Sequence, residues 1–139
     1  MSETSYEVKP IARVESRLID PTSAPNQGDE GAPDAWLVFE PDVLEGLDGI
    51  RPGDQMIVLT WLHRARRDEL RTHPRGDLSR PEEGVFNTRS PSRPNPIGLH
   101  PVEVLSIDSP RVRVRPLEAV DGTPIVDLKP MLSRDVGLR

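Results

Sequence analysis

Cysteine is absent from the 139-residue chain, and aromatic residues are scarce, with only two Trp, two Phe and one Tyr. The lack of cysteine excludes disulfide scaffolds, cysteine-based zinc sites and thiol catalysis. No apolar run approaches the roughly 20 residues that a membrane-spanning helix needs, and the polar, acidic start does not resemble a secretory signal. We therefore expect a cytoplasmic protein that does not associate with membranes.

Proline and glycine are abundant, with 16 and 10 residues respectively. Both residues interrupt helices, so a helical bundle is disfavoured and a compact, loop-rich structure is favoured. The length suits a single domain. We expect one domain over residues 1–139, with its ordered core at about residues 8–132 and flexible termini.

Several short apolar or alternating runs, separated by turn-forming Asp-Gly and Pro-Gly pairs, predict strands. The clearest is the alternating run at residues 111–115, which is typical of a strand with one solvated face. We expect short helices over residues 41–47 and 63–72, and a long loop over residues 21–34. Together these elements predict an all-β fold, a small β-barrel with short helices and long loops. The other predicted strands cover residues 8–14, 35–39, 55–62, 99–107 and 124–128.

Charge is unevenly distributed along the chain, whose formal net charge is −5. Residues 1–50 carry three basic and eleven acidic side chains, whereas residues 51–100 carry nine arginines against six acids. Arginine binds carboxylate and phosphate groups through two parallel hydrogen bonds, which lysine cannot do. Two interpretations remain open, a solvated surface or a patch that faces an anionic partner.

Residues 84–99 form the first of two conspicuous motifs and read GVFNTRSPSRPNPIGL. Three prolines within residues 91–96 fix their own φ angles and extend the residues before them. The motif is therefore predicted to be a stiff, non-helical loop that presents Arg89, Arg93 and Asn95. A stiff loop loses little entropy on binding and suits ligand recognition, although a proline-rich surface connection is the alternative.

The second motif covers residues 121–130 and reads DGTPIVDLKP. Its Asp-Gly pair predicts a turn that offers backbone N–H and C=O groups to a ligand. The two motifs and their separation closely resemble the TrmO (TsaA-like) family, and the resemblance extends over about residues 11–132. It implies a dimeric S-adenosylmethionine-dependent methyltransferase on a small β-barrel. The implied reaction is N6-methylation of threonylcarbamoyl-adenosine beside the anticodon of threonine tRNA.

The resemblance also implies a set of site residues. His63 is the candidate general base, because imidazole titrates in the useful range; a hydrogen bond to the cofactor or within the structure is the alternative. The candidate substrate-binding residues, which would face RNA, are Arg66, Arg67, Arg71, Arg93 and Asn95. The cofactor contacts implied by position are Gln27, Gly28, Asp29, His63, Arg64, Arg89, Leu99, His100, Asp121, Gly122, Thr123 and Pro124.

The three histidines, at positions 63, 73 and 100, lack the spacing of metal ligands, so we expect no metal site. Three functions remain open at this stage. The first is the tRNA methyltransferase, the second a methyltransferase acting on a small amine or hydroxyl compound, and the third a non-catalytic S-adenosylmethionine-binding module. Methyl transfer separates the first two from the third, and tRNA binding separates the first from the second.

Overall fold

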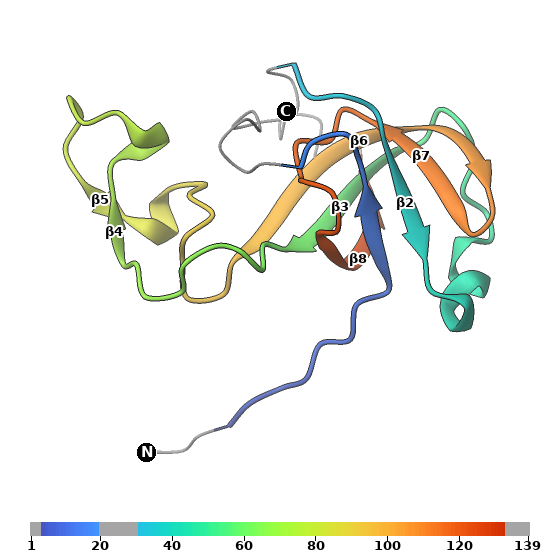
Figure 1. Cartoon of the computed structure of the whole chain (residues 1–139), viewed down its shortest axis with the longest axis horizontal. Coiled ribbons are helices and arrows are strands. Elements are labelled where there is room, and N and C mark those ends of the chain that lie inside the picture. The colour runs from blue at the N-terminus through green and yellow to red at the C-terminus, as the bar shows by residue number, and fades with distance from the viewer. Residues whose placement is uncertain (1–3, 20–30, 133–139) are drawn as a thin grey trace.

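The structure, a computed structural model, describes residues 4–19 and 31–132. Six antiparallel strands close into a barrel in the order β1-β2-β7-β6-β3-β8 (Figure 1). This arrangement confirms the predicted all-β barrel. The strands are β1 (Ala12–Glu15), β2 (Ala35–Phe39), β3 (Gln55–Trp61), β6 (Ile97–Asp108), β7 (Arg111–Arg115) and β8 (Pro124–Pro130).

The barrel interior is filled by the inward-facing residues of each strand. On β7, Val112 and Val114 are buried while the three arginines of the strand point outward. Leu37 on β2 and Ile125 on β8 are fully buried and belong to a single apolar core to which all six strands contribute. Burial of such side chains stabilises the fold by about 1.5–3 kcal/mol each. The period of two in the sequence thus sets which face of each strand lines the core.

Some strand ends differ from their predicted positions. The first strand begins at Ala12 rather than at residue 8, because Pro10 has no backbone N–H to donate to a ladder. The long strand β6 begins at Ile97, two residues earlier than predicted, and β8 continues to Pro130. The helix expected at residues 41–47 is present as the 3₁₀ helix η3 (Pro41–Leu47), and Val43, Leu44 and Leu47 pack against the core.

Between β3 and β6 the chain leaves the barrel, and residues 62–96 form an extension that we call the arm (Figure 1). The arm holds a two-stranded sheet and two 3₁₀ turns rather than an apolar core. Pairing of the two strands brings Arg71 opposite Gly84 and Thr72 opposite Glu83. Its elements are β4 (Arg71–Thr72), η4 (Pro74–Gly76), β5 (Glu83–Gly84) and η5 (Val85–Asn87).

The predicted helix over residues 63–72 is wrong, because this segment forms turns followed by β4. Its only apolar side chains, Ala65 and Leu70, are five positions apart and cannot share one helical face. Leu70 is 62% exposed, and its carbonyl accepts a hydrogen bond from the backbone N–H of Val85 at 2.9 Å. Pairing across the arm therefore replaces the helix.

No helix within residues 4–19 and 31–132 has the length and apolar character needed to cross a membrane.

Candidate functional site

The turn at residues 121–124 is anchored to the end of β1. Asp121 accepts a hydrogen bond from the backbone N–H of Ser16 at 2.9 Å and donates its own N–H to the carbonyl of Leu18 at 2.6 Å. Gly122 donates to the carbonyl of Val14 at 2.7 Å and has a φ of +84°, a conformation that favours glycine. The predicted cofactor turn thus lies against residues 14–18.

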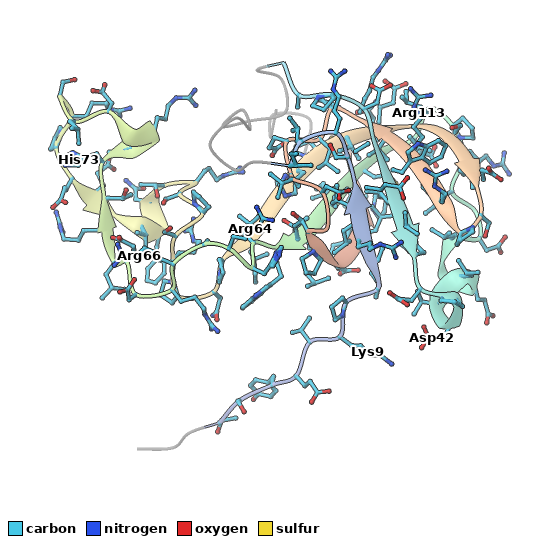
Figure 2. The ribbon with its side chains drawn as sticks, in the orientation of Figure 1. Lys9, Asp42, Arg64, Arg66, His73 and Arg113 are labelled. Atoms are coloured by element: carbon cyan, nitrogen blue, oxygen red, sulfur yellow. The ribbon has the colours of Figure 1, made fainter. Side chains whose placement is uncertain are left out.

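Arg64 reaches the same segment from the other side. It lies three residues after the end of β3, and its guanidinium donates to the carbonyl of Ile19 at 3.4 Å. Figure 2 shows Arg64 on the stretch of chain that joins the barrel to the arm. His63, its neighbour, is exposed, and its backbone N–H donates to the carbonyl of Trp61 at 2.9 Å. Residues 16–19 therefore bring two predicted pieces of the cofactor site together at one end of the barrel.

The remaining predicted cofactor residues fall into different positions. Leu99 on β6 is partly exposed and belongs to the outward-facing set of that strand, whereas His100 is buried inside the barrel. Arg89 lies exposed on the arm, and within residues 4–19 and 31–132 it makes no hydrogen bond or ion pair. The predicted contacts at residues 27–29 lie outside the described residues.

His100 is held between two polar side chains that the sequence analysis did not single out. Its Nε2 lies 2.7 Å from the hydroxyl of Thr60 on β3, and its Nδ1 lies 2.5 Å from a carboxylate oxygen of Glu118. Thr60 is fully buried and His100 is 4% exposed. The only sequence signal was a polar residue at an inward position in each of two otherwise apolar strands.

Arg66 and Arg71, two of the predicted substrate-binding residues, form ion pairs within the arm. Arg66 makes two parallel hydrogen bonds to Asp68, at 3.1 and 3.0 Å, and a third contact with Glu69 at 3.1 Å. The hydrogen bond from Arg66 lowers the pKa of Asp68 below its ordinary value. Arg71 pairs with Glu82 at 3.7 Å. These guanidiniums remain on the surface, but each is partly neutralised.

Arg67 and Asn95 join the arm to the barrel. The guanidinium of Arg67 donates to the carbonyl of Pro94 at 2.7 Å and to the side-chain oxygen of Asn95 at 3.0 Å. It also lies over the ring of Trp61, 5.0 Å from the centroid, in a cation–π contact. These contacts connect the last residue of β3 to the proline-rich loop before β6.

Arg93 organises the first motif from within. Its guanidinium donates to three backbone carbonyls of the motif, those of Val85 at 2.8 Å and of Thr88 and Ser90 at 3.0 Å each. The motif is thus stiffened by an internal arginine as well as by its prolines. A substrate contact by Arg93 stays a prediction.

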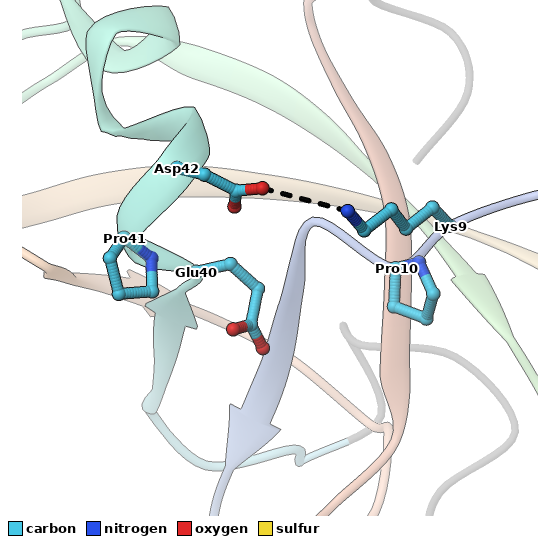
Figure 3. A pocket seen from close by; sticks show the side chains of 5 residues that line it. All are labelled: Lys9, Pro10, Glu40, Pro41 and Asp42. Carbon is cyan, nitrogen blue, oxygen red and sulfur yellow. Dashed lines mark ion pairs between the residues drawn. The ribbon is translucent and has the colours of Figure 1, made fainter.

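Two hollows lie at opposite ends of the barrel. One, of about 510 Å³, is lined by Lys9, Pro10, Glu40, Pro41 and Asp42, with Lys9 and Asp42 paired at 3.6 Å (Figure 3), and it contains none of the predicted site residues. The other, of about 670 Å³, borders the 121–124 turn, because Ser16 lines it and also binds Asp121. It combines an indole with charged groups of both signs, from Trp36, Arg17, Asp34 and Arg113.

A closed all-β barrel with an arginine-rich arm defines a small β-barrel protein, distinct from the α/β nucleotide-binding folds. The family model described as the tRNA-methyltransferase O N-terminal domain matches residues 13–135. The chain belongs to this family, as the two motifs predicted.

Relatives and solved structures agree with this assignment. An "S-adenosyl-L-methionine-binding protein" of Archaeoglobus fulgidus is 43% identical, over 88% of this chain and 86% of its own length. A "Probable S-adenosyl-L-methionine-binding protein" of Methanothermobacter thermautotrophicus is 40% identical, over 94% and 93% of the two chains. A crystal structure of TrmO from P. aeruginosa superimposes with a TM-score of 0.77 and 25% identity over 99% of this chain. This chain spans 59% of that TrmO chain.

Proposed function

We propose that this protein is an S-adenosylmethionine-dependent methyltransferase that methylates N6 of threonylcarbamoyl-adenosine beside the anticodon of threonine tRNA. The observation that carries the proposal is the convergence of Arg64 and the 121–124 turn on residues 16–19, beside a hollow of about 670 Å³. The family and the names of its archaeal relatives support the cofactor.

The chemistry of these residues fits the cofactor. S-adenosylmethionine carries a carboxylate, an ammonium group, ribose hydroxyls and an adenine ring. Arg64 suits the carboxylate, and the Asp121 carboxylate and the backbone carbonyls of its turn suit the donors of the ligand. Trp36 lines the hollow nearby, with Arg111 over its ring at 4.3 Å from the centroid. When bound, the cofactor supplies a methyl group that is already activated by its attachment to a positively charged sulfur.

The protein's own contribution is mainly to hold the acceptor nitrogen in line with the methyl carbon, which can supply about 7–11 kcal/mol of the barrier. Transfer would break the bond between the methyl carbon and sulfur, whose electron pair stays on the sulfur, and form a bond to the nitrogen, which must lose its proton. His63 is exposed at the end of β3, beside Arg64, and we assign it as the proton acceptor. The expected result is that His63→Ala lowers kcat by 10²-fold or more, on the order of a lost general base, with cofactor affinity retained. A change in cofactor affinity alone would place His63 among the binding residues instead.

Arg89 and Asp121 are proposed to bind the cofactor. We expect Arg89→Ala and Asp121→Ala to lose cofactor binding, measured by isothermal titration calorimetry. Wild-type affinity in both variants would contradict this assignment.

The arm is the proposed RNA-binding surface. Residues 62–96 carry eight arginines against five acidic residues, whereas the whole chain has a net charge of −5. Phe86 on η5 is 78% exposed, and exposed aromatic rings stack on unpaired bases such as those of an anticodon loop. Excess positive charge beside a free aromatic ring favours a single-stranded nucleic acid over a small neutral ligand.

Salt dependence tests this surface. Removing phosphate-contacting arginines should lower the slope of log K against log salt by about one per contact. We expect Arg66→Gln and Arg71→Gln to weaken tRNA binding and flatten the slope. The matched control is Arg115→Gln on β7, which removes the same charge from the barrel surface. Equal slopes for all three variants would contradict an RNA-binding arm.

We also propose that the protein acts as a homodimer in the cytoplasm. The arm exposes Leu70 and Leu78 at 62% and 79%, and exposed apolar side chains favour association. Light scattering should give twice the 15.5 kDa chain mass. A mass of 15.5 kDa across the working concentration range would contradict the dimer.

The overall proposal is tested by incubating the protein with S-adenosylmethionine carrying a labelled methyl group and total tRNA from its host. Label in threonine tRNA is the expected result. Cofactor binding without label in RNA would favour a small-molecule acceptor, and binding without any methyl transfer would favour a non-catalytic binding module. Absence of cofactor binding would overturn the proposal.

A further inference from the structure

Three polar side chains form a hydrogen-bonded row next to the apolar core of the barrel: Thr60, His100 and Glu118. The side chains of His100 and Glu118 are only 5% and 15% exposed, and Thr60 is fully buried. Burying polar groups is unfavourable unless they are hydrogen-bonded to one another. Here the distances of 2.7 and 2.5 Å show that all three are paired, in a continuous chain from β3 through β6 to the loop before β8.

The direction of these hydrogen bonds follows from chemistry. An ionised Glu118 can only accept, so Nδ1 of His100 donates to it. Nε2 of a neutral His100 then accepts from the Thr60 hydroxyl, and a protonated ring would donate to the same oxygen. In either state both ring nitrogens are used within the protein. With both ring nitrogens engaged, the His100 imidazole has no hydrogen-bonding atom left for the cofactor, and the contact that the family resemblance implies for this residue stays a prediction.

Gly98 has no side chain, and the hydrogen-bonded side chains of Thr60 and His100 fill the space beside it. A Cβ at Gly98 would lie 2.4 Å from the hydroxyl of Thr60 and 2.6 Å from Nε2 of His100. Such distances are far below van der Waals contact, so only glycine permits the Thr60–His100 hydrogen bond. A glycine, a histidine and a threonine are thus fitted to one another at this end of the barrel.

The two outer residues of this hydrogen-bond chain, Thr60 and Glu118, each lie shortly before a segment of the proposed cofactor site. Thr60 lies three residues before His63 on the way out of β3, and Glu118 lies three residues before Asp121. The two segments are also joined by the pairing of β3 with β8, in which Thr60 lies opposite Ile125, and through residues 14–19, which contact Arg64 and the turn. The buried hydrogen-bond chain adds a side-chain connection between them.

We propose that Glu118, His100 and Thr60 are positioning residues, which set the distance between the His63–Arg64 segment and the 121–124 turn without contacting the cofactor. The claim that these two segments bind the cofactor rests on the proposed function. The claim that the three residues position the segments does not. The chemical reason is that a buried, fully paired hydrogen-bond chain holds its partners more rigidly than apolar contacts do.

The test uses the full chain with two variants that keep side-chain volume. Thr60→Val removes the hydroxyl, and Glu118→Gln removes the charge. Thr60→Ser keeps the hydroxyl and should show the exchange rates and the cofactor affinity of the wild type. Val104→Ala, in the buried part of the same strand as His100, serves as the control for a general loss of stability.

The first measurement is amide hydrogen exchange in the free protein. The N–H groups of Asp121, Gly122 and His63 are hydrogen-bonded to the carbonyls of Leu18, Val14 and Trp61. We expect their exchange to accelerate on the order of tenfold in Thr60→Val and Glu118→Gln, beyond any change elsewhere in the barrel. Unchanged local exchange in both variants, or the same pattern in Val104→Ala, would overturn the proposal.

The second measurement is the Kd for S-adenosylmethionine by calorimetry. We expect about a tenfold weaker affinity in the two variants, with wild-type affinity in Thr60→Ser and Val104→Ala. Faster exchange with unchanged Kd would overturn the role at the cofactor site. A wild-type protein that binds no S-adenosylmethionine would refute the proposed function, while the exchange measurement would still decide whether the chain positions the two segments.

Discussion

Gly98 on β6 shows how one missing side chain can govern a buried polar cluster. Its position opposite Thr60 on β3 places any added Cβ within 2.4 Å of the Thr60 hydroxyl. The hydroxyl cannot move away without breaking its 2.7 Å contact with His100, since all three groups are buried. The demand for glycine here is therefore steric and does not depend on backbone conformation.

We predict that Gly98→Ala lowers the free energy of unfolding by about 1–3 kcal/mol, the usual cost of forcing extra volume into a packed interior. Urea denaturation followed by circular dichroism measures this change. Gly46→Ala is the matched control, because nothing lies within 4 Å of a Cβ built there. The control should stay within about 0.5 kcal/mol of wild type, and equal losses in both variants would contradict the steric explanation.

Asp68 provides a prediction on pH at the residue scale. Its two hydrogen bonds from Arg66 lower its pKa below the ordinary value of 3.8. A lowered folded-state pKa means that the pairing contributes fully above about pH 4 and is lost as the pH falls through the folded-state pKa. The group is exposed, so the effect on global stability is small.

We therefore expect NMR titration of the Asp68 carboxyl to show a pKa below 3.8 that rises toward it in Arg66→Gln. Asp77 is the internal control, because its lowered pKa results from hydrogen bonds with Ser79 rather than from Arg66. A shift at both carboxyls in Arg66→Gln, or at neither, would contradict the pairwise origin of the effect.

At the scale of elements, the arm is held by hydrogen bonds and ion pairs instead of by an apolar core. Its buried residues are Pro74, Val85 and Pro96, and the Arg93 side chain binds the loop that follows Val85. Each hydrogen bond from a charged donor to a carbonyl contributes about 1.5–3 kcal/mol. Removal of Arg93 should thus affect the whole motif at residues 84–98.

We predict that Arg93→Lys loosens this motif, because one ammonium group cannot reproduce the fork with which the guanidinium reaches three carbonyls. Limited proteolysis should cut residues 84–93 several-fold faster, with barrel unfolding unchanged. Arg89→Lys, at an exposed position, is the control and should leave the cleavage rate as in wild type. Equal cleavage rates in both variants would contradict the role of Arg93.

At the scale of the whole molecule, the apolar residues that stabilise the fold and the excess of positive charge lie in different parts of the structure. The apolar core lies within the barrel, whereas the arm contributes arginines and exposed apolar side chains such as Leu78. Figure 2 shows His73 and Arg66 on the arm, well removed from Arg113 on the barrel. This division lets the arm change its surface residues with little effect on the stability of the barrel.

We predict that Leu37→Ala, at a fully buried position, lowers the free energy of unfolding by about 2–5 kcal/mol. Leu78→Ala makes the same chemical change at a side chain that is 79% exposed, and should cost less than about 0.5 kcal/mol. Thermal denaturation of both variants measures the difference. Similar losses would show that the arm shares the core of the barrel.

The strands and turns were predictable because their signals are local. Alternation at residues 111–115 and the Asp-Gly pair at residue 121 depend only on neighbouring residues, and both appear where expected. The helix predicted at residues 63–72 failed because pairing with residues 83–85 overrides local propensity. The stiff loop at residues 84–98 was expected from its prolines, but the role of Arg93 in its interior was not.

By itself, the sequence determined the all-β barrel, the turn at residues 121–124 and, through two motifs, the family. Only the tertiary structure decided which of the predicted residues meet. Arg64 and Asp121 converge on residues 16–19, while His100 turns inward to Thr60 and Glu118, which are 40 and 18 positions away. The physical reason is that periodicity sets which face a side chain occupies, whereas strand register and barrel closure set its partners across the fold.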